Sequence, residues 1–176
     1  MTEGATTVGV VSDTHGTLRP EVLRLFRGVD LILHAGDVGD PQILTDLATL
    51  GPLRAVEGNV DGWDVRREVE EDVELEVAGV RIAVAHGHRV ADYGSLLDRF
   101  PDARVVVHGH SHMPKVDRRE DGRLLLNPGS AGPKRFRKPV TAALLRILPD
   151  GELEVEIRDL ESGEEWRPSG GEADQA

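Results

Sequence analysis

Short, uninterrupted apolar runs recur along the chain, each bounded by glycine or polar residues. Runs of this kind occur at Val8 to Val11, Leu31 to Leu33 and Val105 to Val107. Strands that are buried on both faces have this pattern, because helices cover the two sides of the sheet that contains them. The pattern therefore predicts strands in a sheet that is covered by helices.

Two amphipathic helices are predicted around the first strands. The first begins near Pro20 and ends before Asp30, and the second has Asp40 as N-cap, Pro41 at its first position and Gly51 as its stop signal. The apolar positions recur at three- and four-residue spacing, at Val22, Leu25, Phe26 and Val29 in the first helix and at Ile43, Leu44, Leu47 and Leu50 in the second. This alternation of strand and helix favours parallel strands.

The second half of the chain changes to a period of two. Val73 to Val77 and Val80 to Val84 alternate with charged residues on either side of Ala78-Gly79, which predicts a hairpin with one solvated face. The remaining expected elements are a helix over Ser95 to Phe100 and strands at Leu124 to Leu126, Val140 to Leu148 and Leu153 to Ile157. Many strands with few helices indicate two packed sheets instead of one open sheet.

The length and composition are typical of one soluble globular domain. The chain has 176 residues, of which 39% are hydrophobic and 30% charged. From Ser162 onward Gly, Glu and Ser dominate without any periodicity. We predict one domain over residues 1–161 and an acidic, flexible C-terminal tail over residues 162–176.

The absence of cysteine and the distribution of charge exclude several classes of function. With no cysteine, any metal must be held by His, Asp, Glu or Asn. The net charge is −11, and most of it lies in Pro149 to Ala176, so the body carries no broad basic surface for nucleic acid or an anionic membrane. No apolar stretch is long enough to span a bilayer, and the start lacks a signal-peptide pattern, so we expect a cytoplasmic protein.

All seven histidines lie between His15 and His112, at or just past the end of a predicted strand. The strings that follow the strands are SDTHG at 12–16, HAGD at 34–37, GNVD at 58–61, HGH at 86–88 and GHSH at 109–112. Ligands of α/β sheets gather at the carboxyl ends of strands. We therefore expect these His, Asp and Asn side chains to face one common crevice.

The donor set suits transition metals. Residues two apart project to the same side of an extended backbone, so Asp13 with His15, and His110 with His112, are each expected to hold one site as a pair. Imidazole and carboxylate together favour Mn²⁺, Fe, Zn, Ni or Co, whereas Ca²⁺ and Mg²⁺ prefer oxygen ligands. The donors exceed what one ion needs, which favours two ions that share a bridging carboxylate.

These strings, together with NPGS at 127–130, resemble the calcineurin-like metallophosphoesterases, and most of all their compact YfcE-type prokaryotic members. The resemblance covers residues 8 to about 160. It implies a mixed α/β fold, a four-layer αββα sandwich of two mixed β-sheets flanked by helices, with a dinuclear metal site at the carboxyl ends of the strands. It also implies the ligands, which are Asp13, His15 and His112 for one ion, Asn59, His86 and His110 for the other, and Asp37 between both.

The implied activity is metal-dependent phosphohydrolysis, with phosphodiesters as the expected substrates. Two divalent ions, with Mn²⁺ preferred and Ni²⁺, Co²⁺, Fe²⁺ or Zn²⁺ as alternatives, would lower the pKa of a bridging water and hold the hydroxide in line with phosphorus. The expected partner is a small phosphate ester or a nucleotide-like substrate, and self-association into a homo-oligomer stays open. The alternative function is a non-catalytic scaffold for protein interactions, but a complete ligand set favours the enzyme.

One position departs from the wider superfamily, where a histidine follows the asparagine of the GN motif. Here that position is Val60, which cannot donate a proton. Either His88 takes the catalytic role beside Asp37 and Asn59, or the leaving group is acidic enough to need no proton donor. Packing or solvation is the alternative for His88.

Further residues have two interpretations each. Asn127, Gly129 and Ser130 either bind substrate or form only a turn, and the resemblance favours substrate binding. Lys134 to Lys138 is either a phosphate-steering loop or solvated surface. Asp61 either fixes Asn59 or a ligand imidazole, or makes a local turn with the next glycine. For His34 and His108, a role in orienting the ligands is favoured over metal binding.

Overall fold

The structure is a computed structural model that describes residues 4–168, and within them it contains two five-stranded sheets. The first sheet contains, in spatial order, β10 (Leu153–Asp159), β9 (Thr141–Ile147), β1 (Thr6–Val11), β2 (Leu31–His34) and β3 (Leu53–Ala55). Strands β1, β2 and β3 are parallel, and β9 is antiparallel to both β1 and β10. The sheet is therefore mixed, as predicted.

The second sheet has the same size and the same mixed character. Its spatial order is β4 (Asp72–Val77), β5 (Val80–Ala85), β6 (Val105–Val107), β8 (Leu124–Asn127) and β7 (Lys115–Arg118). The three central strands are parallel, and the two edge strands β4 and β7 are antiparallel to their neighbours. Ala78 and Gly79 turn the β4–β5 hairpin with φ of 48° and 77°, which confirms the predicted hairpin.

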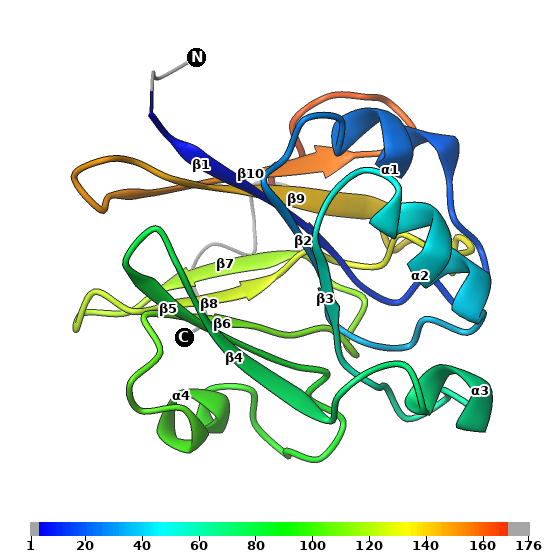
Figure 1. Ribbon diagram of the computed structural model, residues 1–176, viewed down its shortest axis with the longest axis horizontal. Coiled ribbons are helices and arrows are strands. Elements are labelled where there is room, and N and C mark those ends of the chain that lie inside the picture. Colours follow the sequence, from blue (N-terminus) through cyan, green and yellow to red (C-terminus); the bar gives the residue numbers. More distant parts are fainter. Residues whose placement is uncertain (1–3, 169–176) are drawn as a thin grey trace.

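The two sheets pack face to face, and the helices cover their outer faces (Figure 1). The inner core joins residues of both sheets, such as Val10 and Leu33 with Ile82 and Val107. Helices α1 (Pro20–Leu25) and α2 (Pro41–Ala48) pack on the outer face of the first sheet, and α4 (Ser95–Arg99) packs on the second. The predicted order of helix, sheet, sheet and helix is confirmed.

The continuous apolar runs follow from this burial on both faces. Alternate residues of β1 point to different cores, with Val8 and Val10 in the core between the sheets and Val11 in the core beneath the helices. Gly9 lies under Phe26, where an added Cβ atom would come within 2.8 Å of the ring. A strand in this position needs apolar or small residues throughout.

The first helix is shorter than predicted. It ends at Leu25, and Gly28 has φ of 77°, a left-handed backbone that ends helices readily. The apolar spacing was misleading, because Phe26 and Val29 belong to the turn after α1 and still fill the core beneath it. The second helix begins as predicted, with Asp40 accepting a hydrogen bond from the Gln42 N–H at 2.8 Å.

Two short elements lacked a sequence signal. The edge strand β7 is mostly exposed, and α3 (Trp63–Arg66) has only four residues, so neither has the apolar periodicity that predicts an element. Each is fixed by its neighbours, β7 by pairing with β8 and α3 by burial of Val65. Within the described part of the chain, no helix has the length and hydropathy needed to cross a membrane.

The first residues of the expected tail pair with β10. Glu165 forms an antiparallel bridge with Arg158, the Trp166 N–H donates to the Ile157 carbonyl at 2.7 Å, and the Trp166 side chain packs against the inner core. The rest of the expected tail, residues 169–176, lies outside the described residues. The domain boundary at residue 161 stays a prediction.

Candidate metal centre

The parallel strands of both sheets end at the same end of the sandwich, and the loops that follow them carry the predicted ligands. The loops after β1 and β2 carry Asp13, His15 and Asp37, and those after β5 and β6 carry His86, His110 and His112. Their ligand atoms form two groups, each with all atoms within 4.8 Å of one another. The two groups share one residue and consist of Asp13, His15, Asp37 and His112, and of Asp37, His86 and His110.

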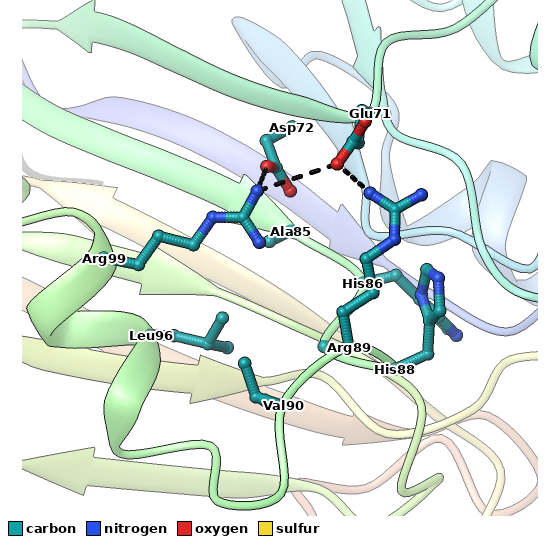
Figure 2. Close-up of a pocket in the computed structure, with 10 residues that line it drawn as sticks. Glu71, Asp72, Ala85, His86, His88, Arg89, Val90, Leu96 and Arg99 are labelled. Atoms are coloured by element: carbon teal, nitrogen blue, oxygen red, sulfur yellow. Dashed lines mark hydrogen bonds and ion pairs between the residues drawn. The ribbon is translucent and has the colours of Figure 1, made fainter.

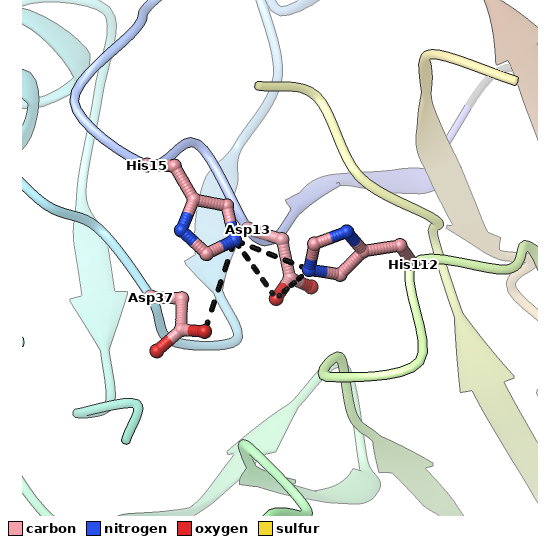
Figure 3. A group of neighbouring side chains, drawn as sticks. All are labelled: Asp13, His15, Asp37 and His112. Carbon is pink, nitrogen blue, oxygen red and sulfur yellow. Dashed lines mark hydrogen bonds and ion pairs between the residues drawn. The ribbon is translucent and has the colours of Figure 1, made fainter. Parts of the chain in front are cut away.

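In the first group, two imidazole nitrogens and two carboxylates converge on one point (Figure 3). The Nε2 atoms of His15 and His112 are 3.1 Å apart. They lie 3.8 Å and 3.2 Å, respectively, from Oδ1 of Asp13, and His15 Nε2 lies 3.8 Å from Oδ2 of Asp37. The two Nε2 atoms and the carboxylate oxygens therefore surround one common space, as the ligand atoms of one cation do.

In the second group, His86 is held in the orientation that a ligand needs. Its Nδ1–H donates to the carbonyl of Ala35 at 2.7 Å, so the lone pair of Nε2 is directed into the site. This Nε2 lies 3.2 Å from Asp37 Oδ2 and 3.2 Å from Asn59 Oδ1. The His110 ring lies 5.2 Å from that of His86, measured between centroids. All seven predicted ligands are thus brought together, with Asp37 between the two groups.

A buried oxygen without a hydrogen bond tests whether these residues fit metal ions. Asp13 is fully buried, and its Oδ2 accepts hydrogen bonds from the Ser12 hydroxyl at 2.7 Å and the His110 N–H at 3.1 Å. Its Oδ1 has no hydrogen-bond partner among the described residues. A buried carboxylate oxygen without a partner is costly in free energy, but it is the atom that a divalent cation would bind. The donor set and this oxygen fit a pair of divalent ions.

Five of the seven predicted ligands have a left-handed backbone. Positive φ angles occur at Asp13 (55°), His15 (46°), Asp37 (52°), His110 (68°) and His112 (60°). The expectation that each D-x-H or H-x-H pair grips one site from extended backbone is therefore wrong in its geometry. His110 and His112 belong to different groups, because the chain curls past the end of β6. Such conformations cost a non-glycine residue about 1–2 kcal/mol, and they concentrate at functional sites.

Comparison with known proteins identifies the family to which this site belongs. Residues 7–149 match the family described as the calcineurin-like phosphoesterase superfamily domain. The chain belongs to this superfamily. A probable metallophosphoesterase from Methanothermobacter thermautotrophicus is 39% identical over 160 residues, which make up 85% of this chain and 90% of that protein. The predicted resemblance is therefore confirmed. The superfamily is one of phosphoester hydrolases that bind divalent metals.

Two solved structures show how widely the superfamily fold is shared. YfcE, a phosphoesterase from E. coli, has a TM-score of 0.65 at 21% identity, and the match covers 91% of this chain and 96% of YfcE. Vacuolar protein sorting 29 from Cryptosporidium parvum has a TM-score of 0.78 at 22% identity, over 92% and 94% of the two chains. These likenesses concern the fold.

The charges of the centre shift the pKa values of its residues. Burial alone would raise the pKa of Asp37, but hydrogen bonds from His86 and the Val60 N–H, with the charges of His86 and His15, lower it to about 2. Burial acts to lower the pKa of His86, but the hydrogen bond with Asp37 and the charge of Asp13 raise it overall. Without metal, the raised pKa of His86 and the lowered pKa of Asp37 favour a proton on His86 that is hydrogen-bonded to the Asp37 carboxylate. A bound cation would displace this proton.

Glycines allow the loops to approach the carboxylates closely. A Cβ atom on Gly58 would lie 2.0 Å from Asp37 Oδ1, and one on Gly109 would lie 2.0 Å from the Ser12 hydroxyl and 2.6 Å from Asp13 Oδ2. Both glycines adjoin predicted ligand motifs, the GN and GH strings. At both positions a larger side chain would displace a carboxylate of the centre.

Asp61 joins two ligand-bearing loops. Its Oδ1 accepts from the Gly39 N–H and its Oδ2 from the Gly58 N–H, both at 2.8 Å. These bonds connect the loop of Asp37 to the loop of Asn59. Asp61 does not contact the Asn59 side chain, a ligand imidazole or the following glycine, but its bond to the Gly58 N–H fixes the loop that carries Asn59 and so bears out part of its first expected role.

His34 is the centre of a buried hydrogen-bond chain. Its Nδ1 accepts from the Gly36 N–H at 3.2 Å, so Nε2 carries the hydrogen and donates to the Thr14 hydroxyl at 3.0 Å, which donates to the Val38 carbonyl at 2.9 Å. Burial lowers the pKa of His34 to about 4 and keeps the ring neutral. The chain ties the loop after β1 to the loop after β2. Thr14 was missed from the sequence, although it lies inside the SDTHG string.

His108 packs behind the centre. Its ring stacks on Tyr93 with centroids 4.4 Å apart, and burial lowers its pKa to about 4. The structure thus places both His34 and His108 behind the ligands and outside the two ligand groups.

The NPGS residues are engaged in supporting the ligand loops. The Asn127 amide donates to the Gly109 carbonyl at 3.0 Å and to the Ser111 hydroxyl at 2.9 Å, and its oxygen accepts from the Gly129 N–H at 2.9 Å. The Ser130 hydroxyl donates to the Asp13 carbonyl at 2.9 Å. All three predicted substrate-binding residues, Asn127, Gly129 and Ser130, are buried. These contacts argue against substrate binding by their side chains and give them a positioning role.

His88 and Arg89 follow His86 of the second group and line the same pocket (Figure 2). The His88 ring lies 5.4 Å from His86, and its Nδ1 is buried without a hydrogen bond among the described residues. Arg89 forms ion pairs with Glu71 and, at 2.8 Å, with Glu57, so the His86 loop is tied to the segment that precedes Asn59. Burial, with the charges of His86 and His110, lowers the pKa of His88 and favours a neutral ring.

Proposed function

We propose that this chain is a metal-dependent phosphodiesterase that uses two divalent ions, Mn²⁺ foremost, on small esters with an acidic leaving group. The observation that carries the proposal is the pair of ligand groups joined by Asp37, together with Oδ1 of Asp13, which has no hydrogen bond from any residue of the described part of the chain. A protein that had no use for metal would gain by replacing a buried carboxylate of which one oxygen has no hydrogen bond among the described residues.

Each ligand has a role that the geometry supports. Asp13, His15 and His112 would hold one ion, Asn59, His86 and His110 the other, and Asp37 both. When bound, two such ions neutralise the phosphate oxygens and activate water for in-line attack on phosphorus. The chain supplies the fixed geometry, through the hydrogen bonds that hold Asp13, His86 and the loop carrying Asn59.

The nature of the leaving group follows from the residues near the second group. Val60 is 54% exposed, offers no side-chain proton, and uses its N–H to donate to Asp37 Oδ1 at 3.0 Å. The lowered pKa of His88 leaves its ring neutral at pH 7, which suits a hydrogen bond to substrate better than proton donation. Aryl or activated phosphodiesters, whose leaving groups depart as anions, are therefore the proposed substrates. Val60→His should raise kcat for alkyl leaving groups more than for aryl ones.

The alternative function is a scaffold for protein interactions, which would have the same fold but would hydrolyse no substrate. The fold alone does not distinguish the two, since an E. coli phosphoesterase and a vacuolar sorting protein both share it. The strained ligand backbones and the unpaired Asp13 oxygen favour a working metal site, because a scaffold has no need of either. A small ester as partner, and residence in the cytoplasm, are part of the same proposal.

The test is hydrolysis after controlled metal loading. Protein stripped with chelator is given single metals and assayed with bis(p-nitrophenyl) phosphate, p-nitrophenyl phosphate and nucleotides. We expect diester hydrolysis to vanish on stripping and to return with Mn²⁺, and Asp37→Asn to lower it at least 100-fold. Asp98→Asn, an exposed carboxylate on α4, is the matched control and should match the parent. Turnover that survives chelation or Asp37→Asn would refute the proposal, and a fully loaded protein that hydrolyses nothing would favour the scaffold.

A further inference from the structure

Residues 134–138, with the sequence Lys-Arg-Phe-Arg-Lys, form a basic loop that the metal centre does not explain. The loop follows the NPGS segment and precedes β9. Four of its five side chains are positive in a chain of net charge −11. Its apolar member, Phe136, is 98% exposed.

The base of the basic loop is fixed to the ligand-bearing segment after β1. The Ala131 N–H donates to the Ser12 carbonyl at 3.0 Å. Gly132 lies so close to that segment that a Cβ atom on it would come within 2.5 Å of the Asp13 carbonyl, and the Arg19 side chain donates to the Gly132 carbonyl at 3.2 Å. The loop therefore starts directly beside the first ligand group.

The far end of the basic loop is fixed to the other side of the same group. The Lys138 ammonium donates to the Ser111 carbonyl at 2.7 Å, and Ser111 lies between His110 and His112. Lys134 pairs with Glu161 at 2.6 Å. The loop thus connects two of the three segments that carry the first group, those of Asp13 and of His112. Its outer residues, 135–137, lie between these two anchored ends.

The outer residues are arranged for contact with something outside the chain. Within residues 4–168, the side chains of Arg135 and Arg137 make no ion pair, and both residues are exposed and adjoin Phe136 in the sequence. Phe136 has φ of 52°, an unfavourable conformation for an aromatic residue, and the Lys138 N–H closes a turn to the Arg135 carbonyl at 3.1 Å.

We propose that the basic loop is a subsite for the substituent that stays on the phosphate, and that this substituent is a nucleoside. Phe136 would stack on the base, as exposed aromatic side chains do on nucleobases, and Arg135 would face the anionic phosphate. The inference rests on the proposed phosphodiesterase function and names its substrate class as nucleoside phosphodiesters.

Two esters with the same leaving group test the subsite on the Mn²⁺-loaded full chain. Thymidine 5′-(p-nitrophenyl phosphate) and methyl p-nitrophenyl phosphate differ only in the retained substituent. Phe136→Leu keeps an apolar side chain but removes the flat ring, so we expect KM for the thymidine ester to rise about tenfold while kcat stays unchanged. The methyl ester should keep its KM, and Phe136→Trp should restore the parental KM for the thymidine ester.

A binding measurement separates this inference from the proposed function. In the Phe136→Trp variant, thymidine 5′-monophosphate should quench tryptophan fluorescence beyond the quenching seen in the parent, whereas inorganic phosphate should not. If both esters are hydrolysed and Phe136→Leu acts like the parent on each, the subsite is wrong and the phosphodiesterase stands. If neither ester is hydrolysed under any metal, the proposed function fails, and the quenching result then decides the nucleoside subsite by itself.

Discussion

Most substitutions destabilise a protein, but replacing Asp13 by asparagine should stabilise this protein when no metal is bound. The carboxylate is fully buried, its Oδ2 accepts two hydrogen bonds, and its Oδ1 accepts none from the described residues. Asparagine has the same shape and keeps one oxygen for the Ser12 hydroxyl and the His110 N–H. Its amide could donate to Nε2 of His112, which lies 3.2 Å from Oδ1.

The size of the effect follows from the cost of the unpaired charge and from metal linkage. Leaving a buried acceptor without a partner costs about 1–3 kcal/mol, so the metal-free variant should be more stable by about 1–2 kcal/mol. For a domain of this length that corresponds to a rise in Tm of roughly 2–8 °C. The parent should instead gain about 2.7 kcal/mol, or roughly 5–11 °C, at a Mn²⁺ concentration 100 times its Kd.

Thermal unfolding with and without metal is the assay. In chelator the Asp13→Asn variant should unfold at or above the Tm of the parent, and in Mn²⁺ the order should reverse, because the variant has lost a ligand. Asp98→Asn, at an exposed site, should follow the parent in both conditions. A variant that is less stable than the parent in chelator, yet gains as much Tm from Mn²⁺, would refute the reasoning.

Three further changes test the supports of the centre. Gly109→Ala should destabilise the protein by about 2 kcal/mol and weaken Mn²⁺ binding measured by calorimetry, because the new methyl group would meet the Ser12 hydroxyl at 2.0 Å. Asp61→Ala should cost about 3 kcal/mol in urea unfolding, since two amides lose their acceptor, and Asp61→Asn should cost less. His34 has a pKa of about 4 when folded against about 6.5 unfolded, so only the unfolded chain binds its proton between these values, and metal-free stability should fall by about 3 kcal/mol from pH 6.5 to pH 4. His34→Gln should flatten that part of the pH profile, and an unchanged profile would contradict the assignment.

Burial on both faces is the reason that much of the fold could be predicted. Strands β1, β2 and β6 lie between two packed layers, so their apolar runs are continuous and easily recognised. The edge strand β7 has no such constraint, because most of its side chains face solvent and its place depends on pairing with β8. The end of α1 was missed because apolar spacing continues into a turn that is equally buried.

The ligands were predictable as residue types after strands, but their geometry was not. A period of two does not reveal a left-handed backbone, which places His110 and His112 in different groups. The roles of Asp61 and Asn127 depend on backbone amides and carbonyls from distant segments, which side-chain motifs do not encode. Sequence patterns therefore predicted which side chains meet at the centre, while the residues that support them required the structure.

The most direct test of the proposed dinuclear centre is a crystal of the protein soaked in Mn²⁺, with anomalous scattering measured at the manganese edge. We predict two peaks, about 3.5–4 Å apart. One should contact Asp13, His15 and His112, the other Asn59, His86 and His110, and Asp37 should touch both. A single peak, or peaks away from Asp37, would contradict the account.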